Sequence, residues 1–181
     1  DQYAASYGGF NKYIFKKNDE VLIESINMDT KNLSKLFNNL KLVWTGEKRN
    51  SSAVASTYNF KNEKTINLFL DMKENVKIVK NILEKGNLNL KDLSKNFKNS
   101  WDNKKKISTT ITTSKINDFS KKLLNEGIEG HRIIGAGGGG FFLCIVNKKQ
   151  VNLLKKKFPK SKILGINFEP LGSRVVSVLY T

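Results

Sequence analysis

The chain has 181 residues, of which 39% are hydrophobic, so it is long enough to bury the core of one domain of ordinary size. It carries 32 Lys and Arg against 16 Asp and Glu, a formal charge of +16. No stretch approaches the roughly 20 consecutive apolar residues that a membrane-spanning helix needs, so we expect a soluble protein with no membrane partner. The single cysteine, Cys144, excludes an internal disulfide and agrees with a reducing cytoplasm.

The first part of the chain is expected to hold three strands. Residues 1–11 are interpreted as a close-packed turn leading into a strand, because small residues are followed by two glycines. Residues 13–26 predict a hairpin, since two apolar runs flank a polar stretch. A buried strand is expected at 40–44, followed by a polar turn and a helix from about Ser51.

The middle of the chain is predicted to be helical. Apolar residues recur at helical spacing over 66–83, with Gly86 as the expected stop, and again over 90–101. Ser114 is expected to cap a third helix that ends near Gly127. This third helix should bury four apolar side chains, those of Ile116, Phe119, Leu123 and Leu124.

The last third predicts strands around one helix. Residues 141–146 are expected to form a central strand, and a helix around Leu154 should end at Pro159. Two closing strands are expected at 163–168 and 175–180. Strands on both sides of a helical middle predict an α+β fold of two layers.

The high positive charge raises the possibility of nucleic-acid binding. The basic residues are 29 Lys and only 3 Arg, and they are scattered along the chain. Sites that read bases or clamp phosphates favour Arg, whose guanidinium presents a planar fork of donors. We therefore interpret most lysines as a solvated surface, with a polyanion-binding face as the alternative. In either case the charge attracts anionic small molecules.

The most informative local feature is the sequence Gly-Ala-Gly-Gly-Gly-Gly at 135–140. Glycine loses much backbone entropy on folding and buries no side chain, so such a run is expected where backbone closely approaches other backbone or a ligand. Its amides could also face an anion. It is not a Walker loop, since no Gly-Lys-Ser/Thr ending follows, and it leads into a strand, unlike a Rossmann loop. By itself it is compatible with a functional loop or with a tight structural turn.

Three other stretches form a pattern with the glycine run. They are Asp-Gln-Tyr-Ala-Ala at 1–5 with Gly-Gly-Phe-Asn at 8–11, Trp-Thr-Gly-Glu-Lys-Arg at 44–49, and Phe-Glu-Pro-Leu-Gly-Ser at 168–173. Together the four stretches resemble the GHMP kinases, and most of all the branch that acts on heptose 7-phosphate. The similarity covers essentially the whole chain.

The resemblance implies a particular domain organisation. Residues 30–181 would form a two-layer GHMP-kinase C-terminal domain, an antiparallel sheet packed on helices. Residues 1–29 would be the last strands of the N-terminal kinase domain. The family's nucleotide-binding segment, Pro-x-x-x-Gly-Leu-Gly-Ser-Ser, does not occur in the 181 residues. We therefore expect a fragment without kinase activity of its own.

The resemblance also implies a reaction, the transfer of the γ-phosphoryl group of ATP to the C1 hydroxyl of D-glycero-D-manno-heptose 7-phosphate. Asp1 stands where the family's catalytic base accepts the proton of the attacking hydroxyl. The implied nucleotide-binding residues are Gly135, Ala136, Gly137, Gly138, Gly139 and Gly140. The implied substrate-binding residues are Gln2, Thr45, Gly46, Arg49 and Arg132. Mg²⁺ would be held by ligands in the missing N-terminal part.

Several interpretations stay open. Arg49 could pair with the sugar's distant phosphate or be a surface arginine at a helix start. Gly130-His131-Arg132 stands where the branch usually has Gly-Gly-Lys, and we interpret His131, the only histidine, as a lone surface residue. No metal-ligand spacing is found. Alternatives to the heptose kinase are a fucokinase-like or galactokinase-like enzyme, a basic nucleic-acid-binding domain, and a non-catalytic domain used for association.

Overall fold

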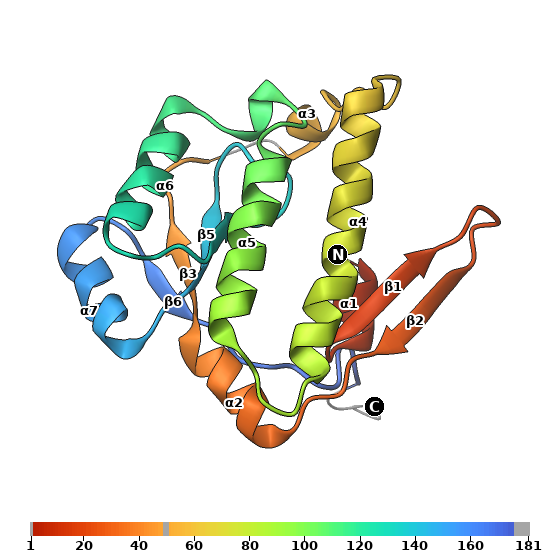
Figure 1. Ribbon diagram of the computed structural model, residues 1–181, viewed down its shortest axis with the longest axis horizontal. Helices are drawn as coiled ribbons and strands as arrows, with labels where there is room; N and C mark the ends of the chain where they lie inside the picture. The colour runs from red at the N-terminus through yellow and green to blue at the C-terminus, as the bar shows by residue number, and fades with distance from the viewer. Residues whose placement is uncertain (1, 49–50, 176–181) are drawn as a thin grey trace, which may run out of the picture.

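The computed structural model describes residues 2–48 and 51–175 (Figure 1). Two strands form a separate antiparallel hairpin, β1 (Asn11–Phe15) and β2 (Val21–Ser25). Four strands form an antiparallel sheet in the order β4-β5-β3-β6, namely β3 (Leu40–Trp44), β4 (His131–Ile133), β5 (Phe141–Ile145) and β6 (Ile163–Gly165). The helices are α1 (Gln2–Tyr7), α2 (Thr30–Asn39), α3 (Ser51–Ala55), α4 (Glu63–Glu84), α5 (Leu90–Lys104), the 3-10 turn η1 (Thr109–Ile111), α6 (Ser114–Asn125) and α7 (Lys148–Lys157).

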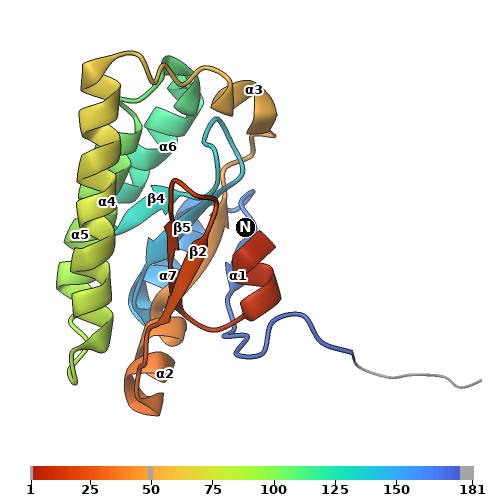
Figure 2. The same cartoon turned by 90° about the vertical axis from the view of Figure 1, so that its right-hand side faces the viewer.

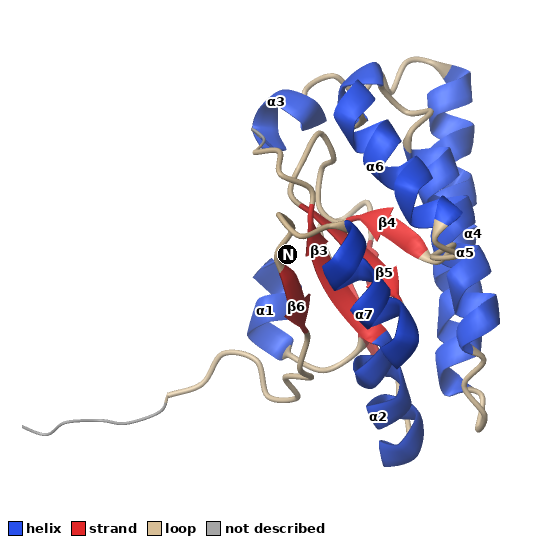
Figure 3. Cartoon of the chain, turned by 90° about the vertical axis from the view of Figure 1, so that its left-hand side faces the viewer, coloured by secondary structure: helices blue, strands red, loops and turns tan. Residues whose placement is uncertain are grey.

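One face of the four-stranded sheet forms the main core. Side chains alternate between the two faces along each strand, which places Val43, Ile133 and Phe142 together on this face, all fully buried. Helices α5, α6 and α7 contribute Trp101, Leu123, Leu154 and their neighbours to the same cluster. Figure 3 shows α6 and α7 in front of this face. The predicted two-layer α+β fold, an antiparallel sheet packed on helices, is confirmed.

The opposite face of the sheet is only partly covered. At one end it joins a second cluster that includes Leu36, Leu40 and Leu83. At the other end Trp44 and Phe141, paired across β3 and β5, stay half-buried with ring centroids 5.0 Å apart. Figure 2 shows the β1–β2 hairpin and α1 on this side of the sheet. The half-covered face is where the candidate site lies.

Two predictions for helix α6 need correction. The N-cap is Thr113, whose hydroxyl accepts a hydrogen bond from the Ile116 N–H at 3.2 Å, so Ser114 is the first helical residue. Leu124 is 38% exposed, whereas Ile116 and Leu123 are fully buried. Leu123 lies seven residues after Ile116 and so on the same face, while Leu124 is turned about 100° away from it. The predicted end near Gly127 is confirmed.

The two ends of the chain also differ from expectation. Residues 2–7 form helix α1, and the turn follows at Gly8 and Gly9, which both have positive φ. Strand β6 covers only three of the six residues expected at 163–168. The strand expected at 175–180 is not formed at Val175, and its remaining residues lie outside the described part. None of the helices within the described ranges has the length and apolar character needed to cross a membrane.

Candidate functional site

The glycine run is packed between two other backbone segments. A Cβ on Gly137 would lie 2.8 Å from the carbonyl oxygen of Ile111, and a Cβ on Gly139 would lie 2.7 Å from that of Glu47. The N–H groups of Gly138 and Gly140 donate to these same two carbonyls, at 2.6 and 2.9 Å. The close backbone approach predicted from the sequence is therefore present, and the neighbour in each case is protein backbone.

The turn at 45–47 and the glycine run form one unit where β3 ends and β5 begins. Both the N–H and the hydroxyl of Thr45 donate to the carbonyl of Gly140, at 3.0 and 2.7 Å. The Thr45 Oγ1 in turn accepts from the N–H of Glu47 at 3.3 Å. Gly46, with φ +84°, allows the turn, and an added Cβ would meet no atom within 4 Å. Two motifs far apart in the sequence are thus joined by direct hydrogen bonds.

The first two residues of the run are held by side chains that the sequence did not single out. The Tyr58 hydroxyl donates to the carbonyl of Ala136 at 3.2 Å, and the Lys104 ammonium donates to that of Gly135. Lys104 is only 6% exposed, and burying a cation is costly unless it is hydrogen-bonded. It lies in a run of three lysines at the end of α5, where nothing in the sequence marks it as the buried one. It holds a hydrogen-bond donor against the backbone of the loop.

His131 is buried, so its interpretation as a surface residue was wrong. Its ring is 1% exposed and packs edge-on against Phe142 with centroids 5.3 Å apart. The Nδ1–H donates to the Ile128 carbonyl at 2.7 Å, and Nε2 accepts from the Ser120 hydroxyl at 2.6 Å. Burial lowers the pKa of His131, which favours the neutral ring. The signal was available, because His131 and Ile133 alternate onto the inner face of β4.

Arg132 faces the other side of β4, towards the half-covered face of the sheet. Its guanidinium donates to the Ser100 hydroxyl on α5 at 2.9 Å. Burial lowers its pKa from the usual value for arginine. The side chain contributes to the lining of a cavity of about 360 Å³ between the β1–β2 hairpin and helices α4 and α5.

The opening and closing motifs are in contact. The N–H of Gly9 donates to the Glu169 carbonyl at 2.7 Å, and the N–H of Ser173 donates to the Ser6 carbonyl at 3.2 Å. Gly8 and Gly172 pack so tightly that a Cβ on either would overlap the other's backbone. The closing segment 168–173 therefore fixes the C-terminal end of α1.

The predicted site residues at the chain start are only partly described. Gln2 is the first residue of α1 and is exposed. Asp1 and Arg49 lie outside the described residues. Within residues 2–48 and 51–175, no group of three or more His, Cys, Asp or Glu side chains is arranged to hold a metal ion.

Comparison with known proteins shows what part of this chain is similar to. Residues 77–163 match the family model described as GHMP kinases C terminal. Over 158 residues the chain is 27% identical to a D-glycero-alpha-D-manno-heptose 7-phosphate kinase of Campylobacter jejuni, which covers 86% of this chain and 46% of the relative. The chain thus spans about half the length of the curated relative that it matches.

Solved structures share the fold. A D-glycero-D-manno-heptose 1-phosphate kinase from Bacteroides thetaiotaomicron has a TM-score of 0.64 at 20% identity, covering 98% of this chain and 49% of that one. A mevalonate kinase from L. major, solved with R-mevalonate, has a TM-score of 0.69 at 21% identity, covering 94% and 52%. The family match over residues 77–163 and the shared fold agree, and this part of the chain is similar to the C-terminal domain of GHMP kinases.

Proposed function

We propose that this chain is part of an ATP-dependent sugar kinase that phosphorylates the C1 hydroxyl of D-glycero-D-manno-heptose 7-phosphate in the cytoplasm. The observation that carries the proposal is the pair of hydrogen bonds that join the Thr45 turn to the glycine run, next to the half-buried Trp44–Phe141 pair. The similarity to a curated heptose 7-phosphate kinase supports the choice of sugar. In this proposal residues 1–29 complete the N-terminal domain and residues 30–181 form the C-terminal one.

In this proposal the chain's own residues position the acceptor. Asp1 accepts the proton of the attacking hydroxyl as the phosphoryl group is transferred. Gln2, Thr45, Gly46, Arg49 and Arg132 line the acceptor site. The acceptor would meet the Thr45 turn as a rigid wall, because the Thr45 hydroxyl is already bonded to the glycine run.

The glycine run, Gly135 to Gly140, would border the nucleotide. Two of its N–H groups, those of Gly138 and Gly140, donate to protein carbonyls, so its contribution is shape and fixed position. The ammonium of Lys104 adds positive charge behind it. A phosphomevalonate kinase of the same fold from Streptococcus pneumoniae was solved with AMPPNP, which supports ATP as the phosphoryl donor.

When bound with the nucleotide, Mg²⁺ would supply positive charge that offsets the negative charge of the phosphates. The described residues offer no cluster of three or more acidic, His or Cys side chains for it. We propose that the Mg²⁺ ligands belong to the part of the kinase outside these residues.

The substrate is tested with the full-length protein made from the complete coding sequence. Heptose 7-phosphate, fucose, galactose and mevalonate are each supplied with ATP and Mg²⁺, and ADP release is measured. Phosphorus NMR then locates the new phosphate. We expect heptose 7-phosphate to give the highest kcat/KM and a phosphate on C1. Preference for an unphosphorylated hexose would contradict the heptose assignment, and no turnover of any sugar would contradict the kinase.

The role of Asp1 is tested by Asp1→Asn in the same full-length protein. Loss of a general base lowers kcat by about 10²- to 10⁴-fold, with the fold unchanged. Asp118→Asn is the matched control, because Asp118 is exposed on α6 and its nearest cation, the Lys121 ammonium, is 4.0 Å away. Equal kcat values for the two variants would remove Asp1 from the reaction. The 181-residue chain assayed alone is expected to turn over no ATP.

A further inference from the structure

The cavity beside Arg132, which we call the hairpin cavity, has apolar walls and a cationic floor. It measures about 360 Å³ and lies between the β1–β2 hairpin and helices α4 and α5. Its apolar lining includes Ile26, Met72, Val76, Val79 and Phe97. Asn75, Asn96 and Ser100 supply hydrogen-bonding groups on the helical side. The lining thus offers both apolar contact and polar partners to one ligand.

Within the described residues, no carboxylate balances the charge of Arg132. Among the ion pairs formed by residues 2–48 and 51–175, none involves Arg132, and its hydrogen bond there goes to the neutral Ser100 hydroxyl. A guanidinium has five N–H donors. A half-buried cation with one neutral partner is unfavourable by itself, because its lost hydration is not compensated by an anion. The arrangement becomes favourable when an anion enters the cavity.

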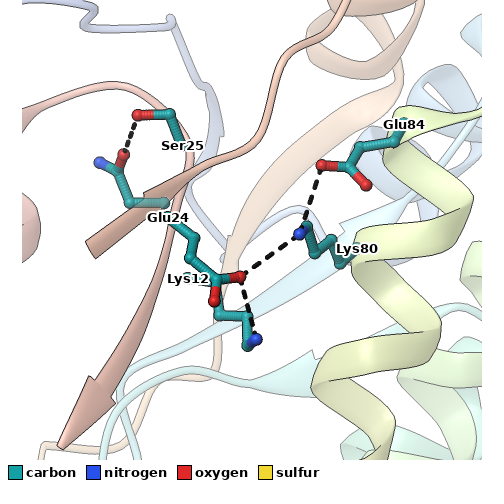
Figure 4. Close-up of polar contacts among 6 residues, drawn as sticks. Lys12, Glu24, Ser25, Lys80 and Glu84 are labelled. Atoms are coloured by element: carbon teal, nitrogen blue, oxygen red, sulfur yellow. Dashed lines mark hydrogen bonds and ion pairs between the residues drawn. The ribbon is translucent and has the colours of Figure 1, made fainter. Parts of the chain in front are cut away.

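Lys12 and Lys80, which line the cavity, belong to an ion-pair network that joins the hairpin to α4 (Figure 4). The Glu24 carboxylate on β2 contacts the Lys12 ammonium at 3.0 Å and the Lys80 ammonium at 3.3 Å. Lys80 also lies 3.7 Å from the Glu84 carboxylate. The two lysines are therefore matched by two carboxylates, and Arg132 supplies the excess positive charge. The network keeps the hairpin in place over the cavity.

Arg132 lies on the same sheet face as Trp44, the residue before the Thr45 turn, at a distance that one extended ligand can span. In the strand register Arg132 is opposite Leu143, which is opposite Leu42, and Thr45 follows three residues later. Two strand spacings and three residues of rise put the Arg132 and Thr45 Cα atoms about 14 Å apart. The long Arg132 side chain shortens the gap that the ligand itself has to bridge.

We propose that the hairpin cavity binds the phosphate end of a phosphorylated sugar, with the Arg132 guanidinium as the phosphate's partner. This rests on the proposed function only in taking that sugar as the phosphoryl acceptor, its free hydroxyl end lying near the Thr45 turn. Arginine pairs with phosphate through two parallel hydrogen bonds, which fixes the orientation of the group. The site thus selects a sugar that already carries a phosphate at its far end.

The proposal is tested by calorimetric titration of the full-length protein without ATP, at constant ionic strength. The probes are glucose 6-phosphate, inorganic phosphate and glucose. We expect both phosphates to bind and glucose to show no binding. Arg132→Gln should weaken glucose 6-phosphate at least tenfold, and Arg132→Lys should weaken it less. Arg174→Gln is the matched control, since Arg174 is exposed and lies 3.7 Å from Glu169. The proposal would be overturned if glucose 6-phosphate bound Arg132→Gln as tightly as the native protein, or if glucose bound as tightly as glucose 6-phosphate.

Two further measurements keep the outcome clear. If Arg132→Gln fails to fold, Val76→Glu places a carboxylate in the cavity wall at a position that is 46% exposed, and should abolish phosphate binding. In kinase assays, Arg132→Gln should raise KM for the sugar phosphate with little change in kcat. A kinase whose KM does not change would refute the cavity and leave the proposed function standing. Phosphate binding that depends on Arg132, in a protein that phosphorylates no sugar, would refute the proposed function and leave the cavity proposal standing.

Discussion

The buried ring of His131 should make the stability of this domain depend on pH. Burial is the main cause of its lowered pKa, and the nearby Lys105 and Lys98 act in the same direction, against the Ile128 carbonyl and Asp102. The folded-state pKa is therefore below the unfolded value of about 6.5. As pH falls through 6.5 the unfolded chain takes up the proton first, so stability falls until the folded-state pKa is passed. One proton limits the slope to about 1.4 kcal/mol per pH unit.

The test compares the native chain with His131→Gln in urea unfolding at pH 8, 7, 6 and 5. At pH 8 the variant should lose about 1–3 kcal/mol, because a buried hydrogen-bond partner, Ser120 or the Ile128 carbonyl, is left unsatisfied. On acidification the difference should shrink, since only the native chain carries the imidazole. His131 is the one histidine, so every other titrating group is common to both proteins. A difference that stays constant or grows towards pH 5 would refute the reasoning.

Three other predictions concern the glycine run, the hairpin and the core. Gly137→Ala should lower the free energy of unfolding by about 1–3 kcal/mol in urea, since its Cβ would lie 2.8 Å from a carbonyl oxygen at φ +112°. Gly86→Ala is the control and should leave the free energy of unfolding unchanged, because a Cβ at this position would meet no atom within 4 Å. Hydrogen bonds from two lysines lower the pKa of Glu24. The stability that this carboxylate contributes is therefore present above its unfolded-state pKa and is lost as pH falls through its folded-state pKa. Glu24→Gln should therefore speed hairpin amide exchange at pH 7 and make no difference in strong acid. Burial raises the pKa of Cys144, whose thiol should react with a maleimide only as fast as the chain unfolds.

The elements with a clear periodic pattern could be predicted from the sequence. The strand expected at 40–44 has the same bounds as β3, and the hairpin and the long helices formed where apolar spacing indicated. Helix α1 was missed because its six residues show no apolar repeat, and its position depends on the closing segment. Strand β6 is short because it pairs with β3 over three residues and then leaves the sheet towards α1.

The sequence indicated which residues form the glycine run of the candidate site, but not which segments would pack against it. The density of glycines indicated a close approach, but not that Ile111 and Glu47 would be the approaching segments. Lys104 is followed by two further lysines, and the packing of α5 against β4 turns it inwards. His131 was assigned from the usual exposure of its residue type, although alternation with Ile133 indicated the inner face. Long-range packing decided each of these cases.

The half-covered sheet face is organised by two structural units. One is the end of β3 and β5, where the Thr45 turn and the glycine run are bonded together. The other is α1, which is fixed by the closing segment and by stacking of Phe10 on Phe168 at 5.4 Å. The hairpin that follows α1 forms the outer wall of the cavity beside Arg132. An acceptor bound between these units would touch both, so the position of the acceptor would depend on how firmly the hairpin and α1 are held. The Glu24 network and the Gly8–Gly172 contact provide that support from opposite ends of the same segment.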